Sequence, residues 1–203
     1  ISESGIHTHA QVRELRQFAN GFLIGSALMG ETDLDAAVRR VILGENKVCG
    51  LTRPQDALAA YQAGAVYGGL IFAPGSPRVV SAAQARTVMS GAPLQYVGVF
   101  RDAPQDDIVS LATGLGLRAV QLHGNETQQT IDALRQALPP QVAIWKALSV
   151  SDSVPARNYR HVDRYVFDQG AGGTGQCFDW SLLAGQVLNN VILACGLRPD
   201  NCA

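Results

Sequence analysis

The stretch LQYVGVFRDAPQDDIVSLATGLGLRAVQLHG (94–124) contains the pattern that decides the fold. It opens with an apolar run at 94–100 that is rich in β-branched and aromatic residues, which predicts a strand. Apolar residues then recur at three- and four-residue spacing over 104–116, with Pro104 in a first-turn position, which predicts a helix. A second strand follows at 118–124. The stretch is therefore a strand–helix–strand unit, the connection that joins parallel strands.

The same alternation extends along the chain in both directions. Further strands are predicted at 21–28, 46–51, 67–72, 142–148, 163–168 and 190–197, with a short one at 1–4. Helices are predicted at 7–19, 32–43, 53–65, 81–90, 126–138 and 179–188, with N-caps at Thr32, Ser81 and Asp179 and a first-turn Pro54. The strands are almost continuously apolar, as in a parallel sheet buried on both faces, so the predicted fold class is α/β.

Repeated strand–helix units fit either an open doubly wound sheet or a closed (βα)8 barrel of the TIM type. No GxGxxG motif follows the first strand, although a dinucleotide-binding open sheet would need one. Polar or reactive residues instead close many different strands: Cys49, Arg101, His123, Lys146, Asp168 and the region of Gly196. In a barrel all of these ends meet around one mouth, where active sites are built, so the barrel is favoured.

The composition of the 203 residues is that of a globular protein, with 47% hydrophobic and 16% charged residues and a formal net charge of −1. This balance argues against nucleic-acid and membrane partners. The chain begins without the basic and apolar segments of a signal peptide, so we expect a cytoplasmic protein. The four cysteines, at 49, 177, 195 and 202, match no zinc spacing and are expected to be free thiols.

Five residues are candidates for chemistry. Cys49 is either a base or nucleophile at the mouth or a buried inert thiol, and Asp168 is either an acid–base group or a turn-capping carboxylate. His123 and Arg78 are binding groups for an anionic substrate or ordinary loop residues. Lys146 ends the run VAIWK and, as an inward lysine near a strand end, needs an anionic partner or the open mouth. A Schiff-base role is a further alternative.

Glycines mark three further candidate positions. A Gly-rich loop follows Asp168 and contains Gly173 and Gly175, which would allow close approach to a ligand. Gly196 begins a turn into a helix start, and Gly25–Ser26 ends an earlier strand in a similar way. Both of these turns are phosphate-site candidates or plain structural turns.

Taken together, the segments KVCGLT, GGLIF…SPR, VQLHGNE, IWKALSV and VFDQGAGGTGQCFDW resemble phosphoribosylanthranilate isomerase, in order, over about residues 45–203. Residues 1–44 resemble the last βα units of indole-3-glycerol-phosphate synthase, to which the isomerase is fused in enteric-type bacteria. The resemblance implies seven isomerase βα units plus one or two from the synthase. It also implies a monomeric protein, with the fused synthase domain as its partner, that binds a small phosphosugar and needs no metal or cofactor.

The resemblance implies an Amadori rearrangement of an aminoaldose to an aminoketose. Asp168 is then the general acid that opens the furanose ring, and Cys49 is the base that removes the C2 proton. Arg78 and His123 match positions near the anthranilate or the sugar. Gly173 and Gly175 then lie in the loop over the sugar ring, and Gly196 belongs to the phosphate-binding site.

Two departures from the family pattern bear on the phosphate site. Cys195 replaces a glycine and Arg198 replaces a small residue in ACGLRPDN.

The sequence also stops before the family's eighth strand. The strand 21–28 could fill that place, with Leu23 beside Val48 and Ile192 and with Gly25–Ser26 on the phosphate. Otherwise the chain is a fragment of the bifunctional protein. Alternative functions are the lyase activity of the fused synthase and a barrel remnant without catalysis.

Overall fold

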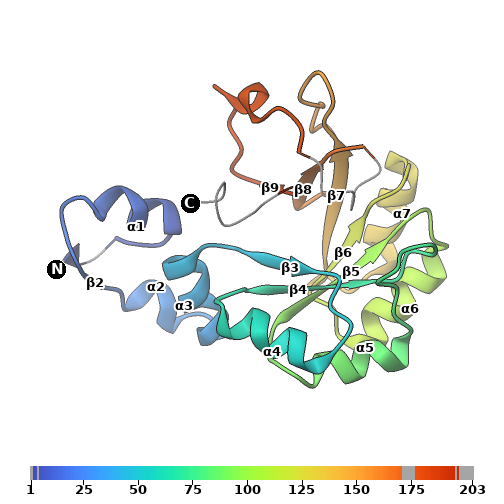
Figure 1. Ribbon diagram of the computed structural model, residues 1–203, viewed down its shortest axis with the longest axis horizontal. Helices are drawn as coiled ribbons and strands as arrows, with labels where there is room; N and C mark the ends of the chain where they lie inside the picture. The colour runs from blue at the N-terminus through green and yellow to red at the C-terminus, as the bar shows by residue number, and fades with distance from the viewer. Residues whose placement is uncertain (1, 4, 171–176, 195, 197–203) are drawn as a thin grey trace. The chain divides into compact units, whose positions relative to one another are not determined.

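The computed structural model describes residues 2–3, 5–170, 177–194 and 196 (Figure 1). The chain divides into two compact units. Unit 1 comprises residues 1–71 and 78–96, and unit 2 comprises residues 72–77 and 97–203. Within the described residues, no helix is both long and apolar enough to span a bilayer.

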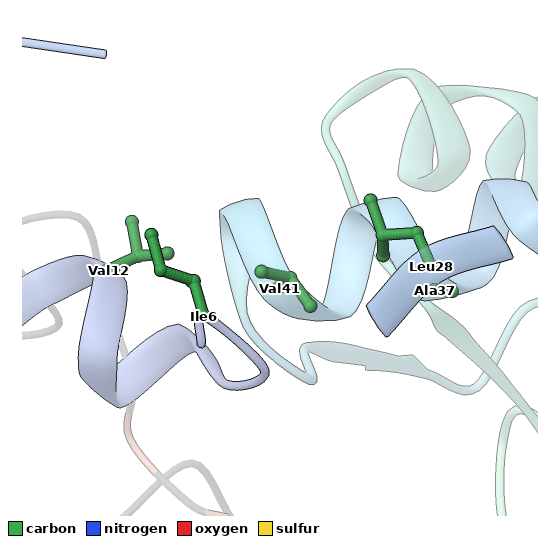
Figure 2. Close-up of a cluster of buried hydrophobic side chains, with 5 residues drawn as sticks. All are labelled: Ile6, Val12, Leu28, Ala37 and Val41. Atoms are coloured by element: carbon green, nitrogen blue, oxygen red, sulfur yellow. The ribbon is translucent and has the colours of Figure 1, made fainter. Parts of the chain in front are cut away.

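Unit 1 begins with a small α/β segment that has a hydrophobic cluster of its own. Strands β1 and β2 pair in parallel as a separate two-stranded sheet, with Glu3 opposite Leu23. Figure 2 shows the cluster, in which Ile6, Val12, Leu28, Ala37 and Val41 are buried. The elements are β1 (Ser2–Glu3), α1 (His9–Leu15), β2 (Phe22–Leu23), α2 (Ser26–Met29) and α3 (Leu34–Leu43).

The second part of unit 1 is a parallel pair of strands with two helices in contact. Strand β3 pairs with β4, with Cys49 opposite Gly69, and α4 packs against α5. Strand β4 is buried along its whole length, as its apolar sequence predicts. The elements are β3 (Lys47–Cys49), α4 (Pro54–Gln62), β4 (Tyr67–Ile71) and α5 (Ala82–Met89).

Unit 2 is a parallel sheet in the order β5-β6-β7-β8-β9. Its largest fully buried side chains, Phe100, Trp145 and Phe167, come from three different strands. Strand β6 is buried throughout, as is β8 after its first residue. The elements are β5 (Gln95–Phe100), α6 (Gln105–Leu115), β6 (Ala119–Leu122), α7 (Gln128–Ala137), β7 (Ala143–Ser149), β8 (Arg164–Asp168), the 3-10 helix η1 (Trp180–Leu183) and β9 (Val191–Leu193).

The predicted α/β class and most predicted elements are confirmed. Ser81 caps α5 in a capping box, and Asp179 caps η1. Pro54 is in the first turn of α4. Pro104 is the N-cap of α6, one position before the predicted first turn.

Three local predictions are wrong: one N-cap, one helix and one strand. The N-cap of α3 is Asp33 and not Thr32, because the Asp33 carboxylate accepts from the Ala36 amide at 3.0 Å. The predicted helix 179–188 is only the short η1. The predicted strand 21–28 is two residues long and turns into α2 after Gly25.

The proposed pairing of Leu23 with Val48 is also wrong. Within unit 1, Leu23 pairs with Glu3 in β1, and Val48 pairs with Gly68 in β4. Strand β2 therefore belongs to the small N-terminal sheet and does not lie beside β3.

The carboxylate of Asp132 on α7 gives a test of pH-dependent stability. It accepts hydrogen bonds from the Gln128 amide at 2.7 Å and the Arg160 guanidinium at 2.9 Å, and these lower its pKa from the ordinary value. A depressed carboxyl pKa stabilises the fold above the unfolded value of about 3.9, and this contribution is lost as the pH falls through the folded value. We predict that Asp132→Asn lowers the free energy of unfolding at pH 7. The urea midpoints of this variant at pH 7 and pH 3 should then differ by less than those of the wild-type protein.

The matched control is Asp152→Asn, which changes an exposed loop carboxylate. It should leave both urea midpoints unchanged. If the urea midpoints of Asp132→Asn at pH 7 and pH 3 differ as much as those of the wild type, the Asp132 carboxylate does not make the proposed contribution to stability.

Candidate functional site

Unit 2 contains a cavity of about 430 Å³ at the carboxyl ends of its strands. Parallel strands end on the same edge of a sheet, so side chains that follow different strands are brought together there. Arg101 follows β5, His123 follows β6, and Asp168 is the last residue of β8. The polar or aromatic groups that line the cavity include Arg101, His123, Glu126, Lys146, Tyr159 and Asp168.

Asp168 and His123 lie side by side in this cavity. Asp168 Oδ2 is 3.6 Å from His123 Nε2, and Asp168 Oδ1 accepts from the backbone N–H of Gln169 at 2.8 Å. Asp168 is only 6% exposed. The imidazole is thus the polar side chain beside this buried carboxyl group.

Gln121 determines how the His123 ring is oriented. Its amide Nε2 lies 3.1 Å from His123 Nδ1. With the amide in this orientation its nitrogen donates, so Nδ1 is assigned as the acceptor and the ring proton of the neutral imidazole is assigned to Nε2, which faces Asp168. Gln121 is 3% exposed, and its Oε1 has no hydrogen-bond partner among the described residues.

Lys146 is not at the end of its strand, as the sequence suggested, but in the middle of β7. Its ammonium is 2.8 Å from Glu126 Oε2 and donates to the Gly124 carbonyl at 2.7 Å. The expected anionic partner is therefore Glu126. The ion pair argues against the Schiff-base alternative, because that chemistry needs a neutral amine that is free to reach a ligand.

Cys49 in unit 1 is the last residue of β3 and carries an exposed free thiol. The alternative of a buried inert cysteine is therefore wrong. The Arg78 guanidinium donates to the carbonyl oxygen of Cys49 at 3.1 Å.

Gly50 makes room for this arginine. Its φ is +84°, and its amide donates to the Gly69 carbonyl at 2.9 Å. A Cβ at this position would lie 2.7 Å from Arg78 Nη1. The residue after the thiol is therefore a glycine for both backbone and steric reasons.

The other predicted glycines belong to different parts of the chain. Gly25 is the N-cap of α2 and Ser26 is the first residue of that helix, both in unit 1. Gly196, in unit 2, has a φ of +55°, and a Cβ there would overlap Cys177 Sγ. Gly173 and Gly175 lie outside the described residues.

Three residues that bond to the cavity side chains or their loops were not predicted from the sequence: Gln121, Glu126 and Asp102, whose carboxylate accepts from the Asn125 amide at 2.7 Å. Gln121 had a usable signal, because it is two residues before His123 and so lies on the same face of the extended chain. Glu126 and Asp102 had none, since their partners come from other segments.

Comparison with known proteins gives two family matches along the chain. The family model "N-(5'phosphoribosyl)anthranilate (PRA) isomerase" matches residues 46–203, and "Indole-3-glycerol phosphate synthase" matches residues 1–41. "Tryptophan biosynthesis protein TrpCF" of Salmonella typhi is 68% identical over 202 residues, which is 100% of this chain and 45% of that protein. The chain thus spans about half the length of the curated relatives that it matches.

Solved structures show the same likeness. The phosphoribosyl anthranilate isomerase of Thermus thermophilus is 33% identical, with a TM-score of 0.66 over 77% of this chain and 79% of that one. A phosphoribosyl anthranilate isomerase in complex with reduced 1-(o-carboxyphenylamino)-1-deoxyribulose 5-phosphate is 30% identical, with a TM-score of 0.64 over 77% and 78%.

The Gln121–His123 contact predicts the tautomer of the ring. In the wild-type protein, the ¹⁵N shifts of neutral His123 should be those of the Nε2–H tautomer. Gln121→Leu should give a mixture of tautomers. It should not lower the melting temperature, because the lost bond, worth about 0.5–1.5 kcal/mol, is offset by removal of an unpaired buried oxygen, which costs about 1–3 kcal/mol. A predominantly Nδ1–H ring in the wild-type protein would refute the assigned donor.

Proposed function

Since the chain belongs to the N-(5'-phosphoribosyl)anthranilate isomerase family, we propose that it converts N-(5-phosphoribosyl)anthranilate to 1-(2-carboxyphenylamino)-1-deoxyribulose 5-phosphate. The observation that carries this proposal is the strand-end cavity of unit 2, in which the buried Asp168 lies beside His123. The fold agrees, since parallel βα units of this kind build the TIM-barrel isomerases that the chain resembles.

We propose that residues 1–44 are the C-terminal βα units of an indole-3-glycerol-phosphate synthase and that residues 45–203 are the isomerase. The two family matches, with their junction between residues 41 and 46, support this division. So does the N-terminal segment, which has its own small sheet and its own hydrophobic cluster. In this division Gly25 and Ser26 contribute to the synthase's phosphate end and not to the isomerase.

The proposed reaction uses Asp168 as the general acid. Its carboxyl proton goes to the furanose ring oxygen, the C1–O bond breaks, and the nitrogen lone pair forms an iminium ion. The iminium makes the C2 proton acidic. His123, held at 3.6 Å, offers a donor that stabilises the carboxylate left behind.

Cys49 completes the reaction as the base. Its thiolate takes the C2 proton and gives an enolamine, and the Arg78 guanidinium lies at the same strand end, where it donates to the Cys49 carbonyl oxygen. The enolamine becomes the aminoketose when C1 gains a proton and the C2 hydroxyl releases one. Proton transfers alone balance the reaction. We propose further that Arg78, His123, Gly173 and Gly175 contact the anthranilate or sugar.

Gly196 is proposed to contact the phosphate. We expect the protein to act as a monomer in a reducing cytoplasm, where Cys49 stays a free thiol.

We predict that Cys49→Ala and Asp168→Asn each lower turnover of phosphoribosylanthranilate by about 10²–10⁴-fold, the range for a lost acid or base. The measurement is the decay of substrate fluorescence after mixing with purified protein, with circular dichroism to confirm folding. Asp132→Asn, on the outer helix α7, is the control and should leave the rate unchanged.

Two outcomes would redirect the assignment. Wild-type turnover in Cys49→Ala would remove the proposed base. No decay with the wild-type protein would favour a barrel remnant without catalysis. The fused synthase's lyase step is the remaining alternative, and it predicts formation of indoleglycerol phosphate from the isomerase product.

A further inference from the structure

The cavity of unit 2 contains a buried ion pair for which the proposed reaction has no use. Lys146 and Glu126 have side chains only 3% and 2% exposed, and Lys146 Nζ lies 2.8 Å from Glu126 Oε2. Burial of a charge pair costs several kcal/mol per ion in desolvation, and apolar residues of the same volume often replace such a pair without loss of stability. The pair is therefore poorly explained by stability alone.

The Glu126 carboxylate uses its whole bonding capacity. It accepts from the backbone N–H of Asp102 at 3.0 Å, from that of Gly124 at 3.1 and 3.0 Å, and from Lys146 at 2.8 Å. A carboxylate offers about four acceptor positions, so none is left for a substrate or a proton. Glu126 is thus suited to hold backbone in place and not to act on a ligand.

Lys146 binds the same backbone segment around Gly124. It donates to the Gly124 carbonyl at 2.7 Å, so both the N–H and the C=O of Gly124 are bonded to the ion pair. Lys146 also lies opposite Leu122 in the β6–β7 register. His123 stands between Leu122 and Gly124, and its own N–H bonds to the Phe100 carbonyl at 2.8 Å. Its backbone is therefore fixed on both sides.

Asp102 ties a second loop into this arrangement. Its φ is +48°, its N–H bonds to Glu126, and its carboxylate accepts from the Asn125 N–H at 2.7 Å. A Cβ on Gly124 would overlap the Asp102 carboxylate, so the two loops are in close contact. The loops after β5 and β6 thus hold each other through reciprocal hydrogen bonds.

From these contacts we propose that Lys146, Glu126 and Asp102 are positioning residues. They lock the loop 123–126 so that the His123 imidazole stays beside Asp168 while the acid gives and regains its proton. The claim rests on the proposed function, in which Asp168 is the acid. It adds a group of residues that act through His123 and do not touch the reacting atoms.

The first test is the double variant Lys146→Met with Glu126→Gln, which removes both charges together and leaves no charge buried alone. It should keep a thermal midpoint close to that of the wild type. Its kcat should fall about 10- to 100-fold, with KM changed less than about threefold, because binding groups remain while the acid site is misaligned. Hydrogen exchange should accelerate at Gly124 and Asn125 but not in strand β6, and the His123 ring signals should shift.

A second test uses the exposed Asp102, whose replacement does not disturb the core. Asp102→Ala loses the bond to Asn125 and should lower kcat several-fold. Asp102→Asn keeps an acceptor oxygen at that position and tolerates the left-handed backbone, so it should recover most of the rate. Asp132→Asn is the control, because it removes a surface ion pair on α7 and should move neither kcat nor the His123 signals.

The outcomes separate this inference from the proposed function. A double variant with wild-type kcat and unshifted His123 signals, alongside inactive Cys49→Ala and Asp168→Asn proteins, overturns the positioning role alone. A raised KM with unchanged kcat also overturns it. If the wild-type protein does not isomerise the substrate, the proposed function fails, while exchange at Gly124 and the His123 signals still decide whether the pair holds the loop.

Discussion

A parallel sheet that is buried along its strands has little space for polar side chains except where the strands end. In unit 2 this constraint places His123 and Asp168 at one edge, because β6 and β8 are apolar and buried up to their last residues. Gln121 and Lys146 are the exceptions, since they point polar groups out of buried strand positions. Each of them is bonded to the edge: Gln121 to His123, and Lys146 to Gly124 and Glu126. The polar groups at this edge of the sheet are therefore connected to one another.

This constraint explains why the sequence predicted so much of the fold and half of the site. Apolar runs bounded by polar residues give the strand ends directly, so the positions of Cys49, His123 and Asp168 followed from the pattern. The same reasoning placed Lys146 at an end, because a lysine normally closes an apolar run. The error arose because its partner Glu126 belongs to another segment, and pairing between segments has no periodicity in the sequence.

The weaker predictions failed for a local reason. The run 21–28 is apolar in a way that fits both a strand and a helix, and Gly25 divides it into two residues of β2 and one turn of α2. Thr32 and Asp33 are adjacent residues that both favour N-caps, and the choice depends on which side chain reaches the Ala36 amide. Such details are set by backbone geometry that the pattern of residue types does not contain.

The left-handed turn at Gly50 restricts how this protein can change over evolutionary time. Any other residue there would have to accept an unfavourable backbone conformation and move the Arg78 guanidinium away from the strand end. Both penalties arise from a single substitution, so position 50 is constrained to glycine as long as Arg78 keeps this position. Libraries that seek new activities on this scaffold should therefore keep glycine at position 50.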